Sequence, residues 1–185
     1  GSCRHKLKDE DFEKIIETFD KYQIGYFVYI GGNDSMDTAH RLSEYIKKIG
    51  RDIKVIGVPK TIDNDLVNTH FCPGYGSAAK YIATSVREMS LDADVYAKDI
   101  VTIVEVMGRN SGFLAAAGAL ARDNVVSSPH LIYFPEIPFD ENEFLNDIKT
   151  TFKRNNGKVF IVASEGLKNK DGNYIYLSEQ KADAF

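Results

Sequence analysis

The sequence predicts an α/β protein, a Rossmann-like three-layer fold with a mostly parallel sheet and helices on both faces. Two observations carry this prediction. Short β-branched and aromatic runs alternate along the whole chain with longer segments in which apolar residues recur at helical spacing. In addition, no repeat, linker or low-complexity stretch divides the chain. Residues 1–185 are therefore predicted to form a single domain.

The first third of the chain alternates helix and strand twice. Apolar residues recur at helical spacing over 9–23 and again over 34–49, and Gly50 supplies the left-handed position at which helices commonly end. Residues 26–30 and 53–58 are short apolar runs rich in β-branched side chains, and each leads into a polar loop. These four segments are predicted as two helices and two strands.

The middle of the chain continues the alternation. Residues 76–89 have helical periodicity, and residues 111–121 are small side chains that suit a closely packed helix. The run 100–106 is almost entirely apolar and β-branched, which is typical of a central strand covered on both faces. Residues 131–134 are a further strand, which Pro135 ends.

The last third adds one helix and one strand. Asp140 and Glu143 form an Asp-x-x-Glu signal that predicts the start of a helix over 140–155. Residues 158–163 are the final predicted strand. The polar stretch 168–174 is predicted to be a hairpin or a lid.

Composition limits the possible functions. The chain has 185 residues, of which 43% are hydrophobic and 27% charged, so it can bury a core. Its net charge is −4 and its basic residues are not clustered, which disfavours a nucleic-acid or membrane partner. No apolar run approaches a membrane span and no signal-peptide pattern is present, so a cytoplasmic location is expected. Cys3 and Cys72 are expected to be reduced thiols, and the four histidines show no metal-ligand spacing.

Polar residues concentrate where predicted strands end. In parallel sheets ligands bind outside the carboxyl ends of the strands, so these loops are expected to share one rim. The four loops are Gly31-Gly32-Asn33-Asp34-Ser35, Pro59-Lys60-Thr61-Ile62-Asp63-Asn64-Asp65, Met107-Gly108-Arg109-Asn110 and Ser164-Glu165-Gly166.

Two of these loops have recognisable chemistry. Glycines that open a helix let a phosphate approach free backbone amides. Asp34 in that loop would repel phosphate unless a cation such as Mg²⁺ lay between them, and Lys60 could offset the remaining charge. Asp63 and Asp65 follow a strand as paired carboxylates and are candidates for a base or an ion ligand. The alternative for the first loop is a plain connection between strand and helix, and the alternative for the second is a plain turn led by Pro59.

In their order and spacing these segments resemble the 6-phosphofructokinase family, and Gly1-Ser2-Cys3-Arg4 is similar to a further family segment. The resemblance implies phosphoryl transfer to the 1-hydroxyl of fructose 6-phosphate, giving fructose 1,6-bisphosphate in glycolysis. It assigns the base to Asp63, with Lys60 and Arg4 at the transferring phosphates. The implied substrate contacts are Thr61, Asp65, Met107, Gly108, Arg109 and Glu165. The implied phosphate-donor contacts are Gly32, Asn33, Asp34, Ser35 and Lys60.

The donor implied by the resemblance is pyrophosphate. ATP-dependent members have glycine at the positions of Asp34 and Lys60, and both changes resemble the pyrophosphate-dependent branch. Asp34 adds bulk and negative charge where a nucleotide's α-phosphate would lie, whereas Lys60 can bind a short diphosphate. The implied cofactor is Mg²⁺, carried over to Asn33 and Asp34, although family members usually have aspartate at the first position. Asp63 is a further candidate ligand.

Family members are longer, so the chain resembles an internal piece that lacks the N-terminal phosphate loop and the C-terminal part. Little or no turnover is expected from this piece alone, and the intact enzyme is expected to be a homo-oligomer. One alternative is an ATP-dependent 6-phosphofructokinase. NAD and diacylglycerol kinases share a glycine-rich loop but lack the Thr61-to-Asp65 and Met107-to-Arg109 segments. Another alternative is a non-catalytic, sugar-phosphate-binding regulatory subunit, which would not need Asp63 as a base.

Overall fold

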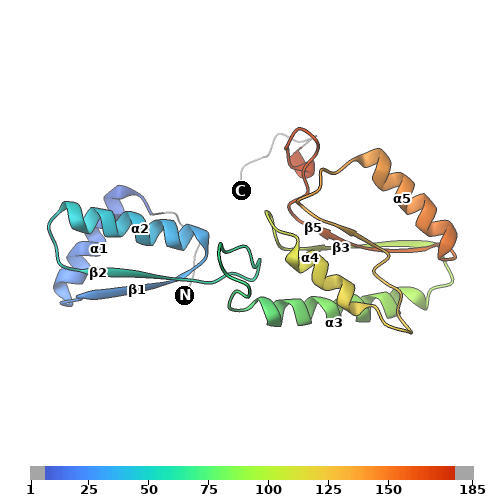
Figure 1. Ribbon diagram of the computed structural model, residues 1–185, viewed down its shortest axis with the longest axis horizontal. Coiled ribbons are helices and arrows are strands. Elements are labelled where there is room, and N and C mark those ends of the chain that lie inside the picture. The colour runs from blue at the N-terminus through green and yellow to red at the C-terminus, as the bar shows by residue number, and fades with distance from the viewer. Residues whose placement is uncertain (1–6, 178–185) are drawn as a thin grey trace. The chain divides into compact units, whose positions relative to one another are not determined.

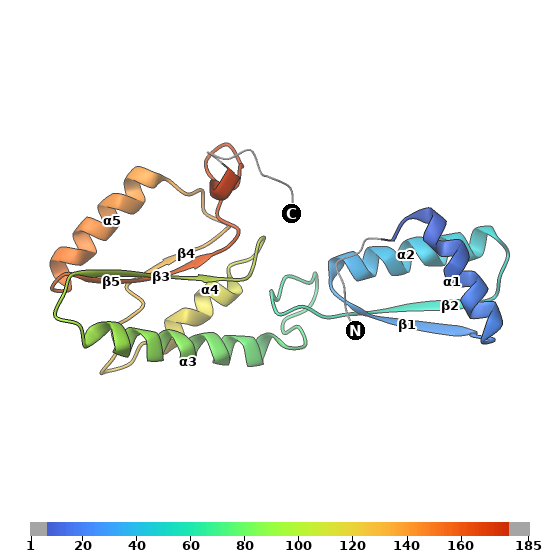
Figure 2. The same cartoon turned by 180° about the vertical axis from the view of Figure 1, so that it is seen from behind.

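The computed structural model describes residues 7–177. The chain divides into two compact units, Gly1–Thr61 and Ile62–Phe185, and each unit contains a parallel sheet of its own. Figures 1 and 2 together label the α-helices and β-strands of both units. Cys3 and Arg4, for which a reduced thiol and a phosphate contact were predicted, lie outside the described residues. The prediction of one domain over 1–185 remains a prediction.

Over its described residues, 7–61, the first unit contains two helices and two strands. In order, these are α1 (Asp9–Lys21), β1 (Tyr26–Gly31), α2 (Asn33–Lys48) and β2 (Lys54–Pro59). The two strands pair in parallel, from Tyr26 opposite Lys54 to Gly31 opposite Pro59. Parallel pairing through a helix is the connection that the alternating sequence pattern predicted.

The core of the first unit lies between the helices and one face of this sheet. Phe12 of α1 and both Leu42 and Ile46 of α2 are buried together, and Phe27 of β1 packs against them. The alternate residues of β1, such as Val28 and Ile30, are more than half exposed. Among the described residues of this unit, both helices therefore contribute to a core on a single face.

The part of the second unit that the structure describes, residues 62–177, contains a three-stranded sheet and three α-helices. Its elements are α3 (Tyr75–Asp94), β3 (Ile100–Val106), α4 (Phe113–Ala117), the 3₁₀ turn η1 (Gly118–Ala121), β4 (Leu131–Tyr133), α5 (Glu141–Arg154), β5 (Lys158–Ser164) and the 3₁₀ turn η2 (Ile175–Leu177). The strand order is β3-β5-β4, and both pairs are parallel.

Helices cover both faces of this second sheet. Figures 1 and 2 show α5 on one side of β3 and β5, and α3 and α4 on the other. On the α3 side, Val86 of α3, Leu114 of α4 and Val162 of β5 are fully buried in one cluster. The predicted α/β fold class, with parallel sheets and helices on both faces, is confirmed.

The prediction that 100–106 forms a central strand was wrong for the described residues. β3 is an edge strand, and its alternate residues Val101 and Ile103 are exposed. The central strand is β5, in which the residues from Val159 to Val162 are all buried. A β-branched run indicates strand propensity, but the order of strands depends on which segments pair.

Most other elements lie close to their predicted bounds, with two exceptions. The helix predicted over 76–89 continues to Asp94 as α3. The predicted helix over 111–121 begins only at Phe113 and tightens into a 3₁₀ turn at Gly118. Ser111 belongs to the preceding loop instead. The predicted start of α5 is confirmed, since the Asp140 carboxylate accepts hydrogen bonds from the Asn142 and Glu143 amides.

The polar segment after β5 forms the predicted hairpin. Lys168 and Tyr174 make an antiparallel bridge. Across the described part of the chain, no helix has both the length and the apolar character needed to cross a lipid bilayer.

Candidate functional site

The predicted site loops lie side by side in pairs, one pair in each unit. In the first unit Gly31 lies opposite Pro59, and the Lys60 amide donates to the Gly31 carbonyl at 2.8 Å. In the second unit Val106 lies opposite Ser164, so the loops after β3 and β5 are neighbours. The convergence of strand ends is thus found within each sheet, and a single rim shared by all four loops remains a prediction.

The glycine loop of the first unit leads directly into α2. Gly32 is the residue before the helix, and its carbonyl accepts the Met36 amide at 3.0 Å. A side chain on Gly31 would meet the Ser35 hydroxyl oxygen at 2.1 Å, so Ser35 needs glycine there. Asn33 and Asp34 are exposed in the first turn. This arrangement presents helix amides and side-chain oxygens together, which suits a phosphate accompanied by a cation.

Asp63 in the second unit lies among other charged groups. Burial, together with the nearby carboxylates of Asp65 and Glu165, raises the pKa of Asp63 above its usual value of 3.8. The guanidinium of Arg109 acts in the opposite direction and partly offsets the rise. The structure therefore brings together four of the predicted site residues, from three separate loops. A carboxyl group with a raised pKa is well suited to accept a proton near neutral pH.

The loop that carries Arg109 is packed tightly against the loop after β5. The Gly108 amide donates to Glu165 Oε1 at 3.3 Å, and the Ser164 hydroxyl donates to the Gly108 carbonyl at 2.6 Å. A side chain on Gly166 would lie 2.0 Å from the Arg109 carbonyl oxygen, so only glycine fits there. These contacts leave the Arg109 side chain exposed on a fixed backbone.

The loop that carries Asp63 is held by its own asparagine. Asn64 has a left-handed φ of 59° and is 5% exposed. Its side-chain oxygen accepts the Cys72 amide at 2.8 Å, and its side-chain nitrogen donates to the His70 carbonyl at 3.2 Å. Next to it, Asp65 Oδ1 is buried and has no hydrogen-bond partner among the described residues. Such an oxygen is available to a substrate hydroxyl or a cation.

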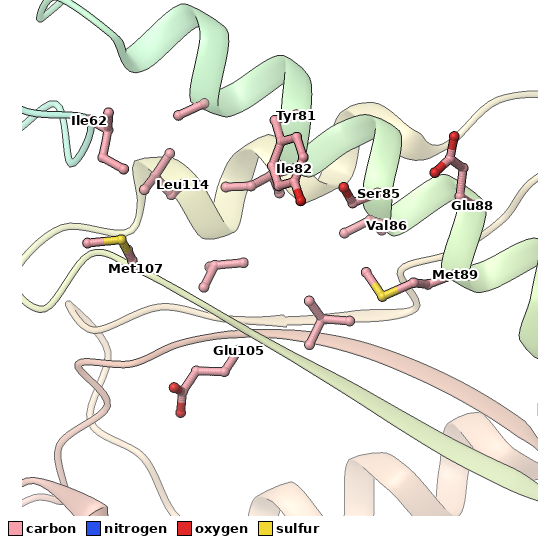
Figure 3. A pocket seen from close by; sticks show the side chains of 13 residues that line it. Ile62, Tyr81, Ile82, Ser85, Val86, Glu88, Met89, Glu105, Met107 and Leu114 are labelled. Carbon is pink, nitrogen blue, oxygen red and sulfur yellow. The ribbon is translucent and has the colours of Figure 1, made fainter.

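A cavity of about 560 Å³ lies between α3 and β3 in the same unit, as Figure 3 shows. Its walls are mainly apolar and include Ile62, Ile82 and Met89, with Met107 at one end. None of the 13 residues lining it is lysine, arginine or histidine. A phosphorylated sugar needs a cationic partner, so this cavity does not suit one.

The residues assigned to Mg²⁺ have suitable donor atoms. Asn33 and Asp34 offer oxygens at the start of α2, and Mg²⁺ in proteins commonly uses one or two carboxylates together with substrate phosphates. No group of three histidine, cysteine or acidic side chains within residues 7–177 could hold a metal ion unaided. In the second unit, the buried Asp65 Oδ1 is a further oxygen of the type that Mg²⁺ prefers. The residues therefore fit a cation that is held jointly with a phosphate, not one caged by protein alone.

Three residues that hold these loops or the segments next to them had not been assigned a role from the sequence. Asn64 closes the Asp63 loop, Ser111 donates from its hydroxyl to the Asp63 carbonyl at 2.7 Å, and Glu136 accepts the Gly112 amide at 2.7 Å. Ser111 and Glu136 were missed because their partners are distant in sequence. Asn64 could have been found, because an asparagine between two aspartates after a strand is a common left-handed turn residue.

The fold and the clustered groups define an α/β protein whose charged loops lie at the carboxyl ends of parallel strands, where ligands commonly bind in such folds. The family profile described as "Phosphofructokinase" matches residues 1–184, and the chain belongs to this family. Among similar curated proteins, a "Pyrophosphate--fructose 6-phosphate 1-phosphotransferase" of Halomonas elongata is 45% identical over 192 aligned positions, which cover 100% of this chain. The protein of the same name from Methylococcus capsulatus is 43% identical and aligns with 95% of the chain.

A solved structure agrees with the fold. The crystal structure of a pyrophosphate-dependent phosphofructokinase from Marinobacter aquaeolei has a TM-score of 0.78 and 48% sequence identity, and the match covers 92% of this chain and 43% of that one. The chain spans 45% and 43% of the lengths of the Halomonas and Methylococcus proteins. The chain thus corresponds to somewhat less than half of such proteins.

Proposed function

We propose that the full-length protein transfers a phosphoryl group from pyrophosphate to the 1-hydroxyl of fructose 6-phosphate, giving fructose 1,6-bisphosphate. The observation that carries this proposal is the grouping of Asp63 with Asp65, Glu165 and Arg109, which supplies a base of raised pKa beside a cation. The names of the relatives support the same reaction and the same donor. Asp34 and Lys60 stand where the ATP-dependent pattern has glycine, which supports pyrophosphate further.

The proposed reaction is an in-line displacement in which Asp63 is the general base. Asp63 removes the proton of the sugar 1-hydroxyl while the oxygen of that hydroxyl attacks one phosphorus atom of pyrophosphate. The bond from that phosphorus to the bridging oxygen breaks, and inorganic phosphate leaves. Arg109 and Glu165 orient the sugar phosphate. The planar guanidinium of Arg109 can bind two phosphate oxygens at once. Thr61, Asp65, Met107 and Gly108 complete this substrate set.

The phosphates of the donor, pyrophosphate, are proposed to bind at the start of α2 and at Lys60. Free amides of the first turn and the Lys60 ammonium would bind the diphosphate, with Gly32 and Ser35 shaping the loop. When bound, Mg²⁺ would neutralise phosphate charge, and Asn33 and Asp34 are the residues proposed to hold it. We also propose that the enzyme acts in cytoplasmic glycolysis as a homo-oligomer. The 185-residue piece alone is proposed to be inactive, since it spans 45% of a relative's length.

The direct test is an assay of the full-length protein. Formation of fructose 1,6-bisphosphate is measured with Mg²⁺ and fructose 6-phosphate, with pyrophosphate and ATP as donors in parallel. Activity with pyrophosphate alone is expected. Activity with ATP alone would keep the reaction but overturn the donor assignment. If neither donor works while calorimetry shows fructose 6-phosphate binding, the protein is a sugar-phosphate-binding regulatory subunit.

Donor choice is expected to respond to two substitutions in the first unit. Asp34→Gly combined with Lys60→Gly removes the carboxylate and the cation that favour a short diphosphate, so the variant is expected to begin to use ATP and to lose affinity for pyrophosphate. The measurement is the ratio of kcat/KM for the two donors. Asp52→Gly, which removes an exposed carboxylate ahead of β2, is the control and should leave the ratio unchanged. If the double variant still does not use ATP at all, residues other than Asp34 and Lys60 select the phosphate donor.

The pH dependence is expected to follow the raised pKa of Asp63. Below that pKa the carboxyl is protonated and cannot accept a proton, so kcat/KM should fall as the pH falls through it, at a pH above 3.8. Asp65→Asn removes a negative neighbour, lowers the pKa of Asp63 and should move the acidic limb to lower pH. Asp171→Asn makes the same change in net charge on the exposed hairpin and should not move it. If the acidic limb of the kcat/KM profile is not shifted in Asp65→Asn, the assignment of this limb to Asp63 is contradicted.

A further inference from the structure

Ser111 links the loop after β3 to the backbone of Asp63. It is 6% exposed, and its hydroxyl donates to the Asp63 carbonyl oxygen at 2.7 Å. The two residues are 48 positions apart in the sequence. Arg109 lies two residues before Ser111. This hydrogen bond therefore joins the segment that carries Asp63 to the loop that carries Arg109.

The rest of the loop after β3 is held independently of Ser111. Its first part is fixed by the hydrogen bonds of Gly108 to Ser164 and Glu165, and its last part by the Gly112 amide, which donates to Glu136 Oε1 at 2.7 Å. Loss of the Ser111 hydroxyl would therefore leave this loop anchored at both ends.

Asp63 has a different kind of support. On its C-terminal side the Asn64 amide group ties the loop to His70 and Cys72, which lie within the same segment. Those bonds shape the segment but do not place it relative to Arg109. The Ser111 hydrogen bond, in contrast, runs from the loop that carries Arg109 to the backbone of Asp63 itself.

We propose that Ser111 is a positioning residue that sets the distance between the Asp63 base and the Arg109 loop. This proposal rests on the function proposed above. A general base must lie within about 2.6–3.2 Å of the proton donor, so a small displacement of Asp63 weakens proton transfer. The phosphate of the sugar is assigned to Arg109 on the loop after β3, and this loop keeps its other anchors. Ser111 is thus expected to affect the chemical step more than binding.

The kinetic test compares two buried serines in the full-length protein. Ser111→Ala is expected to lower kcat by ~10-fold or more and to change KM for fructose 6-phosphate by less than about threefold, because misplaced reacting groups cost rate more than affinity. The matched control is Ser90→Ala. Ser90 is 1% exposed and donates to the Arg87 carbonyl within α3, so its loss removes a comparable buried hydrogen bond away from the loops.

Two kinetic outcomes would overturn the proposal. One is a kcat of Ser111→Ala within about twofold of the wild-type value. The other is an equal loss of kcat in Ser90→Ala, which would show that general destabilisation is responsible. Thermal melting of both variants checks that they are folded at the assay temperature.

A second measurement does not depend on catalysis. Amide hydrogen exchange over residues 62–74 of the full-length protein is expected to be faster in Ser111→Ala than in the wild type, and unchanged in Ser90→Ala. Unchanged exchange in Ser111→Ala would overturn the positioning role. If the wild type makes no fructose 1,6-bisphosphate with either donor, the proposed function fails, whereas the exchange result still decides whether Ser111 holds this segment.

Discussion

Replacement of Asp63 by alanine in the full-length protein is expected to lower turnover by ~10²-fold or more, the range that loss of a general base produces. KM for fructose 6-phosphate should change little, because the assigned sugar-phosphate contacts of Arg109 and Glu165 remain. The measurement is steady-state kinetics with saturating pyrophosphate and Mg²⁺. Turnover at the wild-type level would remove Asp63 from the mechanism.

Asp63→Asn separates catalysis from folding. Asparagine keeps the shape of the side chain but carries no charge, and it should be as inactive as alanine. Because the folded protein raises the pKa of Asp63, the ionised carboxylate is disfavoured there, and a neutral isostere should leave the melting temperature unchanged or raise it. A large fall in melting temperature would instead indicate that the Asp63 carboxylate stabilises the fold.

Arg109→Ala is expected to raise KM for fructose 6-phosphate by about 10- to 100-fold, which corresponds to the loss of one or more hydrogen bonds to a charged phosphate. kcat at saturating substrate should fall less, since Arg109 is assigned to binding. Arg109→Lys should give an intermediate KM, because lysine keeps the charge but not the planar fork. Kinetics at varied fructose 6-phosphate concentration measures both variants.

The control for Arg109 is an arginine of the same unit with a structural role. Arg87 on α3 makes an ion pair with Asp123 and hydrogen-bonds to the Ala121 carbonyl. Arg87→Ala should lower stability while leaving KM unchanged. If KM is insensitive to Arg109→Ala, the sugar phosphate binds at a different place.

Local sequence patterns were sufficient to predict most elements of this fold. Helical periodicity, Gly50 after α2 and the Asp140 cap of α5 are properties of short segments, so they could be recognised without knowledge of the fold. The same holds for the polar loops after β1, β2, β3 and β5. The alternating pattern predicted parallel strands whose polar ends lie at one edge of a sheet, but the structure alone showed which loops are neighbours.

Strand order was not accessible in this way. The run 100–106 looked like a central strand, yet β5 is central among the described residues and β3 is at the edge. Side-chain composition reports how well a segment suits a sheet, whereas its neighbours are selected by packing over the whole unit. The shortened α4 has a similar origin, since Ser111 is engaged by the Asp63 carbonyl and lies outside the helix.

The sequence by itself determined the α/β class, the family and the set of charged residues at the strand ends, because each of these depends on residue type and local spacing. Only the tertiary structure decided which of those residues meet. It placed Asp63 among Asp65, Glu165 and Arg109, and it joined Ser111 to Asp63 across 48 positions. Burial and charge proximity set the pKa of Asp63, and both arise only when loops distant in sequence are packed together.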